Sequence, residues 1–332
     1  MVKKLTLMVI TLLCICGANA QSGKKSKCVP VIFDTDMGPD YDDVGAITLL
    51  HYFADKGEAK ILATMASTRY PRVAAVLSVL NTYFKKPDIP IGTPRDDASD
   101  QPDFQKWSDT LVVKYPHKIR SNTDAMDAVK LYRKILAKQP DRSVTIITVG
   151  FFSNIAILLQ SPADEYSPLS GQALVEKKVL KMVSMAGQFP LGREFNVYER
   201  AAASKYVFDH FTRPVIFSGN EIGSKIKSGL LLTRNENIIN SPVKDVFSIS
   251  IPQAKEDADG RMSWDETAVL VGITGAAPYF KLQPGKISVN ADGSNSWDTT
   301  AGNQYYLTFA RPINEIQTLI NNLIMHQPGK RD

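Results

Sequence analysis

Five aspartates lie within ten residues near the start of the chain: Asp34, Asp36, Asp40, Asp42 and Asp43. Carboxylates crowded on one short segment repel one another, and they cannot all ionise at close range unless a positive charge lies among them. A hard divalent cation with oxygen ligands supplies such a charge. A solvated acidic loop would explain two or three aspartates, but five favour a site for a metal ion or a polyol.

The sequence around these aspartates predicts how they are positioned. Residues 29–33 are apolar and rich in β-branched side chains, which predicts a buried strand. After the aspartates, Val44, Ile47 and Leu50 recur at helical spacing. The carboxylates therefore lie on a strand-to-helix loop at the carboxyl end of a strand, which is where open α/β sheets bind ligands.

The remaining chain alternates between strand and helix patterns. Residues 95–122 are polar and are predicted to form an irregular surface excursion, and the helix at 124–138 is predicted to be N-capped by Asn122 or Thr123. This alternation predicts a single α/β domain over 29–330, with a mostly parallel open sheet flanked by helices. The further predicted strands are 59–67, 87–94, 144–150, 179–187, 214–218, 286–290 and 305–309, and the other helices are 72–84, 153–160, 199–211, 265–276 and 313–325.

The N-terminus has the pattern of an export signal. A positively charged start is followed by an apolar run at 5–16 and by the small-residue cleavage motif Ala18-Asn19-Ala20. We expect a signal peptide at 1–20, followed by a flexible leader at 21–28. The apolar run is too short for a stable membrane anchor. These features predict secretion across an inner membrane into a bacterial periplasm.

Composition limits the partners. Hydrophobic residues make up 44% and charged residues 22% of the 332 residues, as in ordinary soluble globular proteins. The net charge is +5, and Lys3 and Lys4 of the predicted signal contribute to it. This charge is too small to indicate a nucleic-acid partner. Cys28 is the one cysteine after the signal, which excludes an internal disulfide.

Two known aspartate patterns do not fit the acidic loop. In an EF-hand, Gly and a terminal Glu would stand where this chain has Pro39 and Gly45. A phosphatase of the haloacid dehalogenase type also begins with a strand and D-x-D, as at Asp34 and Asp36, but it has Thr or Val where Gly38 stands.

A third pattern fits better. The loop resembles the N-terminal motif of the inosine–uridine-preferring nucleoside hydrolases, which is D-T-D-x-G followed by D-D and a helix of small apolar residues. Asp40 and Tyr41 are two extra residues relative to that spacing. The resemblance extends over about 29–325 through four later stretches in the same order: ITVGFFSNIA (147–156), SMAGQFPLGREFNVY (184–198), FSGNEIG (217–223) and MSWDETAVLVG (262–272).

The resemblance implies metal-dependent hydrolysis of the N-glycosidic bond of ribonucleosides, releasing base and ribose. It implies that Asp36 is both a metal ligand and the general base, and that the other ligands are Asp43, Asp265 and the Val149 carbonyl. It also implies that Asp42, Glu194 and Asn196 hold the ribose hydroxyls. Ca²⁺ is the expected ion, since every ligand is oxygen.

One departure from the family pattern concerns the leaving base. Trp264 stands where the family commonly has a His that assists the leaving group, so we expect Trp264 to line the base pocket. Asp40 and Glu221 have no assigned role. Two other functions stay open: a metal-dependent phosphatase or other hydrolase on the same aspartates, and a non-catalytic nucleoside- or sugar-binding protein. A small-molecule nucleoside is the expected partner, and a homo-oligomer is left open.

Overall fold

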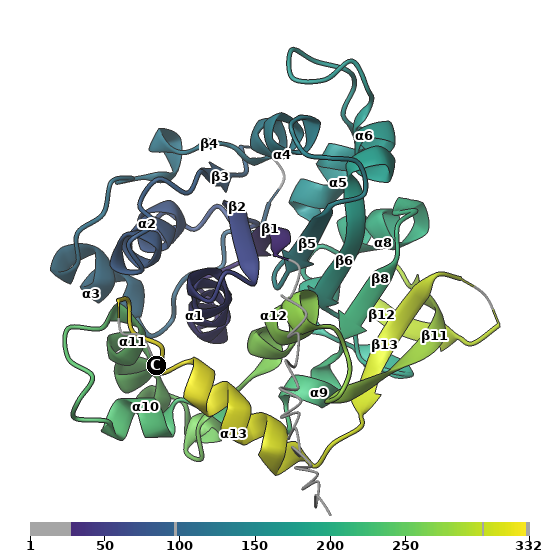
Figure 1. The fold of residues 1–332 in the computed structure, drawn as a ribbon. Helices are drawn as coiled ribbons and strands as arrows, with labels where there is room; N and C mark the ends of the chain where they lie inside the picture. Colours follow the sequence, from purple (N-terminus) through teal and green to yellow (C-terminus); the bar gives the residue numbers. More distant parts are fainter. Residues whose placement is uncertain (1–27, 96–97, 301, 330–332) are drawn as a thin grey trace, which may run out of the picture.

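A large, mostly parallel sheet forms the centre of the protein (Figure 1). The computed structural model describes residues 28–95, 98–300 and 302–329, so the predicted signal peptide and residues 21–27 of the predicted leader lie outside it. Eight strands run parallel, in the spatial order β4-β3-β2-β1-β5-β6-β8-β13. They are β1 (Val29–Thr35), β2 (Ala59–Ala66), β3 (Ile91–Thr93), β4 (Met126–Asp127), β5 (Val144–Thr148), β6 (Val179–Met185), β8 (Val215–Ser218) and β13 (Gln304–Phe309).

Three antiparallel strands extend the sheet beyond β13. They follow in the order β11 (Phe280–Val289), β12 (Ser294–Asp298) and β7 (Leu191–Arg193). A separate two-stranded ribbon pairs β9 (Lys227–Ser228) with β10 (Arg261–Met262). The prediction of a single α/β domain with a mostly parallel sheet flanked by helices is confirmed.

Strand β1 is buried on both faces. Val31 and Phe33 belong to one apolar core cluster and Ile32 to the other, because successive side chains of a strand point to opposite faces. One cluster is covered by α1 (Asp42–Asp55), α2 (Val73–Tyr83), α11 (Pro242–Ser250), α12 (Trp264–Thr274) and α13 (Ile313–Leu323). The other is covered by α4 (Ala128–Ala137), α5 (Ser153–Gln160), α6 (Gly171–Lys178) and α8 (Ala201–His210).

The surface excursion predicted for 95–122 is partly wrong. It contains a helix, α3 (Trp107–Lys114), whose Trp107 and Leu111 are fully buried. These two residues are four apart, so they lie on one helix face and fill the core against α2 and α11. The predicted cap of the next helix is also wrong. Asn122 and Thr123 form a short 3₁₀ turn, and α4 begins after Asp127, whose carboxylate accepts a hydrogen bond from the Lys130 N–H at 2.8 Å.

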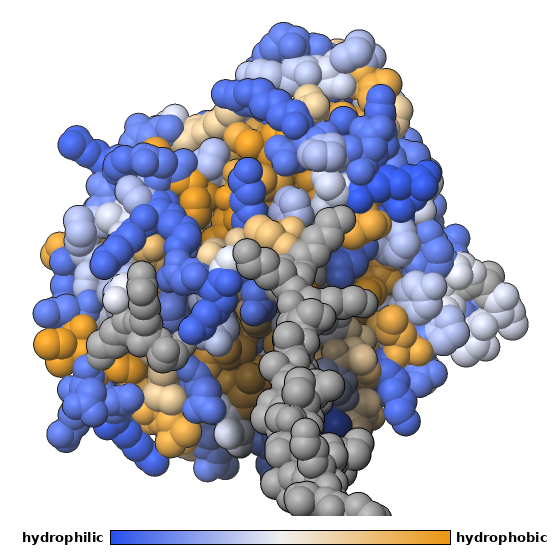
Figure 2. Space-filling model, viewed as in Figure 1, coloured by the Kyte–Doolittle hydropathy of each residue, from blue (hydrophilic) through white to orange (hydrophobic). Residues whose placement is uncertain are grey.

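Several elements had no prediction. They are α6, α11, β7, β12, the first half of β11 and the short helices α7 (Phe195–Tyr198), α9 (Asn220–Gly223) and α10 (Leu230–Arg234). In the part of the chain that the structure describes, no helix is long and apolar enough to cross a membrane. Hydrophilic side chains cover much of the face drawn in Figure 2, and apolar ones gather in patches between them.

Strand β1 ends at the point where the strand order reverses. The chain passes from β1 to β2 on one side, whereas β5 pairs with β1 on the other side. In open α/β sheets the carboxyl ends of strands at such a point border a crevice that binds ligands. Asp36, Asp40, Asp42 and Asp43 follow this strand end, as their sequence position predicted, whereas Asp34 lies within β1.

Candidate active site

The first aspartate of the acidic loop is structural. Asp34 is fully buried in β1, and its carboxylate accepts hydrogen bonds from the Tyr132 hydroxyl at 2.8 Å and from the Asn154 amide at 3.1 Å. Burial raises the pKa of Asp34 to about 7. These contacts join β1 to α4 and α5, and Asp34 does not line the cavity described below.

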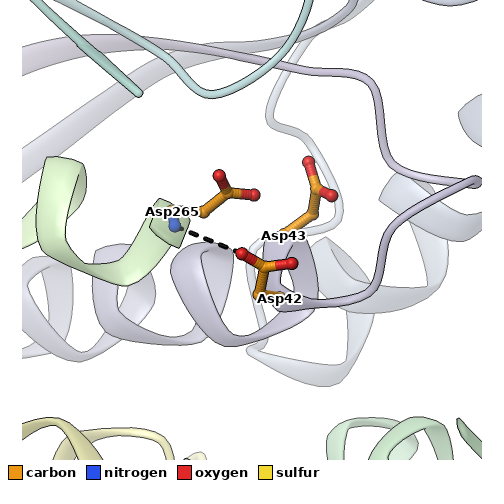
Figure 3. A group of neighbouring side chains, drawn as sticks. All are labelled: Asp42, Asp43 and Asp265. Atoms are coloured by element: carbon orange, nitrogen blue, oxygen red, sulfur yellow. Dashed lines mark hydrogen bonds between the residues drawn. The ribbon is translucent and has the colours of Figure 1, made fainter. Parts of the chain in front are cut away.

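Three other aspartates converge from two helix starts (Figure 3). Asp42 and Asp43 occupy the first turn of α1, and Asp265 occupies the first turn of α12. One carboxylate oxygen from each lies within 4.8 Å of the other two, and all three residues are buried. The pKa of Asp265 is raised well above its usual value by burial and by the charge of Asp43. The helices α1 and α12 pack side by side, so tertiary packing joins residues 222 positions apart.

Asp36 lies beside this group rather than within it. It is 2% exposed, and the pKa of its carboxyl is raised by burial first and then by the charge of Asp43. Gly150, just after β5, permits this loop to come close, because a Cβ there would lie 2.4 Å from the Asp36 backbone nitrogen. The sequence therefore places a glycine where any side chain would push Asp36 out of position.

The buried oxygens fit a hard cation. Asp36 Oδ2 and Asp43 Oδ2 have no hydrogen-bond partner among the described residues, while Asp43 Oδ1 accepts a hydrogen bond from the Thr35 hydroxyl. Buried carboxylate oxygens without a donor are costly unless a cation compensates them. All the candidate donor atoms are oxygen, which suits Ca²⁺ or Mg²⁺ better than a soft metal.

A cavity of about 210 Å³ opens over these carboxylates. Seven of the eight predicted site residues line it, and the eighth, Asp43, lies behind it in the carboxylate group. Sequence reasoning had not selected four of the lining residues: Met185, Arg193, Phe195 and Asn220. All four lie within stretches that carry the resemblance, 184–198 and 217–223, and Arg193 and Phe195 are direct neighbours of Glu194, so these positions were the available signal. The lining residues are Asp36, Asp40, Asp42, Val149, Met185, Arg193, Glu194, Phe195, Asn196, Asn220, Trp264 and Asp265.

Glu194 and Asn196 reach the cavity from the start of the short helix α7. Glu194 caps α7: its Oε1 accepts from the Asn196 N–H at 2.8 Å, and its Oε2 accepts from the Gly187 N–H at 2.9 Å. Burial raises the pKa of Glu194 to about 7. Both side chains are thus held by backbone groups, in fixed orientations.

The Val149 carbonyl is tied to the same network. It accepts a hydrogen bond from the Asn196 side-chain amide at 2.9 Å, and that amide also donates to the Met185 carbonyl at 3.1 Å. Because a carbonyl oxygen has two lone pairs, Val149 keeps one for a cation. Asn196 therefore connects the predicted ribose contacts to a predicted metal ligand.

Trp264 forms one wall of the cavity. Its indole N–H donates to the Asn220 carbonyl at 3.0 Å, which orients the ring at the start of α12. None of the four histidines lines the cavity. His51, for example, is buried, bonded to Asn81 at 3.1 Å and stacked on Phe84, as a structural residue would be.

Of the two residues without an assigned role, Asp40 lies at the cavity and Glu221 does not. Asp40 lines the cavity and forms an ion pair with Arg261. The Oε2 atom of Glu221 accepts from the Phe189 N–H at 3.0 Å, and Glu221 does not line the cavity. Gln188 also does not line the cavity, and its backbone N–H and carbonyl are hydrogen-bonded to the Asn295 side chain.

Comparison with known proteins agrees with this geometry. Residues 31–316 match the family model of the inosine-uridine preferring nucleoside hydrolases. A pyrimidine-specific ribonucleoside hydrolase, RihA, of Escherichia coli (strain SMS-3-5 / SECEC) is 26% identical over 234 residues, which are 66% of this chain and 69% of that protein.

Solved structures share the fold. A purine-preferring ribonucleoside hydrolase from Gardnerella vaginalis aligns over 89% of this chain and 99% of its own, with a TM-score of 0.71 and 17% identity. An inosine-uridine preferring nucleoside hydrolase from Bacillus anthracis aligns over 90% and 99%, with a TM-score of 0.69 and 13% identity. With the family model matching most of its length, the chain belongs to the inosine-uridine preferring nucleoside hydrolases, a family of N-glycosyl hydrolases.

Proposed function

We propose that this protein hydrolyses the N-glycosidic bond of ribonucleosides with the help of a divalent cation, Ca²⁺ by the chemistry of its ligands. One observation carries the proposal. The carboxylate group of α1 and α12, the Glu194 and Asn196 pair and an aromatic wall meet at one cavity, in the arrangement that this reaction needs. The family match favours this reaction over the phosphatase alternative.

The cation would be held by Asp36, Asp43, Asp265 and the Val149 carbonyl. When bound, it supplies positive charge that lowers the pKa of a neighbouring water. Asp36 suits proton transfer, since its Oδ2 faces no donor among the described residues. We assign to Asp36 the role of general base, which takes a proton from the attacking water.

Asp42, Glu194 and Asn196 would hold the ribose hydroxyls. The bond between the anomeric carbon and the base nitrogen breaks, its electron pair leaves with the base, which takes up a proton from solvent, and the water oxygen bonds to the anomeric carbon after its proton has passed to Asp36. Charge builds up on the sugar in an oxocarbenium-like state, as in other glycoside hydrolysis. The neighbouring carboxylates stabilise that positive charge, and contacts to the hydroxyls align the ring.

A nucleoside panel tests the proposal. The curated relative is named pyrimidine-specific and the Gardnerella structure purine-preferring, so the panel must include both classes of base. We expect the purified protein to release reducing sugar from at least one ribonucleoside when Ca²⁺ is present, and to lose this activity on chelation. If no ribonucleoside releases sugar but some bind, the nucleoside-binding function is the correct one.

Trp264 is expected to select among bases. A stacked pair of aromatic rings is worth about 0.5–1.5 kcal/mol, so Trp264→Ala should change the ratio of kcat/KM between a purine and a pyrimidine ribonucleoside by about two- to twelvefold. Calcium affinity should stay within about threefold, because the ring offers no ligand atom. Trp264→Phe keeps a ring but loses the N–H that donates to the Asn220 carbonyl, so its kcat/KM ratio should lie between those of the wild type and Trp264→Ala. An unchanged ratio in Trp264→Ala would show that the base binds elsewhere.

A further inference from the structure

One buried cation stands among the carboxylates of the site. Arg261, in the short strand β10, is 8% exposed. Its Nε and Nη2 donate to Asp42 Oδ1 at 3.0 and 2.8 Å, and the Asp265 N–H donates to Asp42 Oδ2 at 3.3 Å. Both oxygens of Asp42 are therefore held. Of the three clustered aspartates, Asp42 is the one whose charge is already paired.

The residues at which this chain departs from the family pattern surround Arg261. Asp40 forms an ion pair with Arg261, and the guanidinium lies over the Tyr41 ring at 4.7 Å from its centroid. It also lies over the Trp264 ring at 5.0 Å. Asp40 and Tyr41 are the two extra residues of the acidic loop, and Trp264 replaces the common His. Three separate departures thus meet at one side chain.

Asp257 and Tyr41 also hold Arg261 in place, on the side away from the cavity. The Tyr41 hydroxyl donates to Asp257 at 2.6 Å, and Asp257 lies 3.6 Å from the Arg261 guanidinium. Arg261 itself does not line the cavity, whereas Asp40, Asp42 and Trp264 do. Arg261 therefore acts on a substrate through its neighbours, and these three are the neighbours that it contacts at the cavity wall.

We propose that Arg261 is a positioning residue, which holds Asp42 as an acceptor for a sugar hydroxyl and keeps it out of the metal's coordination. It also joins Asp40 and Trp264 to Asp42 as one wall of the cavity. The assignment rests on the proposed function, since it concerns how the ribose is held. The planar guanidinium matters, because its Nε and Nη2 converge on one oxygen of Asp42 from a rigid fork, which a lysine ammonium cannot reproduce.

The test begins with Arg261→Lys, which keeps the charge. We expect kcat/KM for the preferred ribonucleoside to fall about 10- to 100-fold, while calcium affinity measured by titration calorimetry stays within about threefold. Asp42→Asn should likewise lower kcat/KM and leave calcium affinity nearly unchanged. Both variants are then assayed with the ribonucleoside and with its 2′-deoxy and 3′-deoxy analogues. The analogue that lacks the hydroxyl bound by Asp42 should be the one least affected by either substitution.

A double-mutant cycle separates positioning from general damage. If Arg261 acts through Asp42, adding Arg261→Lys to the Asp42→Asn variant should lower kcat/KM by less than about threefold. The effects of substituting two residues in contact do not add. Full additivity, or a tenfold loss of calcium affinity in Arg261→Lys, would overturn the proposal. Arg133→Lys is the matched control: Arg133 is 2% exposed and pairs with Asp164 at 2.7 Å, away from the cavity, so kcat/KM should stay within about threefold.

A metal measurement tests the same idea without turnover. Arg261→Gln frees Asp42 beside Asp43 and Asp265, so calcium affinity should stay equal or increase, provided that the variant folds; if it does not, Arg261→Lys supplies the result. A different result is expected if the proposed hydrolase function itself is wrong. In that case the wild type releases no ribose, and Arg261 is judged by ribonucleoside affinity, where the same tenfold loss and the same coupling to Asp42 are required.

Discussion

Replacing Asp36 with Asn should remove most of the turnover. Asp36 is buried at the cavity wall, and its Oδ2 has no hydrogen-bond donor among the described residues. An amide of the same shape cannot accept the proton from water. A general base contributes about 10²–10⁴-fold, and a weaker hold on the cation adds to this loss. Single-turnover and steady-state measurements of ribose release at saturating Ca²⁺ would separate the two contributions.

The fold should survive this change. Asp36 is repelled by Asp43 and Glu194, which raise its pKa in addition to burial, so the neutral amide should leave the unfolding temperature in the absence of metal unchanged or higher. Asp103→Asn is the matched control, because Asp103 is also a buried carboxyl of raised pKa, but it lies outside the cavity, where it accepts a hydrogen bond from the Ser108 N–H at 2.7 Å. Its kcat should stay within about threefold. Ribose release by Asp36→Asn at the wild-type rate would disprove the assigned role.

Replacing Asp43 with Asn should abolish tight metal binding. Asp43 is fully buried, one of its oxygens is held by Thr35, and the other has no partner among the described residues. Changes to residues that only support a ligand cost about 10–100-fold in metal affinity, so loss of a ligand should cost at least about 100-fold. Calorimetric titration with Ca²⁺ measures this directly, and turnover should fall in parallel.

Stability gives the Asp43 variant a second signature. Ca²⁺ at 100 times its Kd stabilises the wild type by about 2.7 kcal/mol, and Asp43→Asn should lose most of that gain. Without metal the variant should be as stable as the wild type or more stable, since it removes one charge from a buried acidic group. Urea unfolding of the wild type and of Asp43→Asn, measured in chelator and in Ca²⁺, tests both predicted differences in stability. Asp42→Asn is the comparison that should retain calcium affinity, and equal losses in the two variants would contradict the division of roles between them.

The acidic loop shows how far local pattern can predict a site. The apolar run before Asp34 and the helical spacing after Asp43 predict a strand and a helix from neighbouring residues, and the structure has β1 and α1 there. The later residues of the site came instead from the resemblance to the nucleoside hydrolases, whose further stretches follow in the same order in this chain. Val149 directly follows β5 and Glu194 directly follows β7, and both line the cavity.

Elements without strong periodicity needed the folded chain. Helix α3 carries two buried apolar residues among polar ones, so burial of Trp107 and Leu111 appears only when α2 and α11 pack against them. The position of Glu194 and Asn196 also needed the folded chain, because Glu194 caps the short helix α7, for which the sequence offered no prediction.

Arg261 marks the limit of the sequence by itself. Residue types and spacing determined the chemistry of the loop, the fold class and the residues of the family pattern. Arg261 lies in a two-residue strand, without a motif of its own, more than 200 positions after its partner Asp42. A contact between such distant positions is decided by packing of α12 against α1, and not by local propensity. Only the tertiary structure could show that Asp42 is already paired, because burial and charge pairing depend on which surfaces meet.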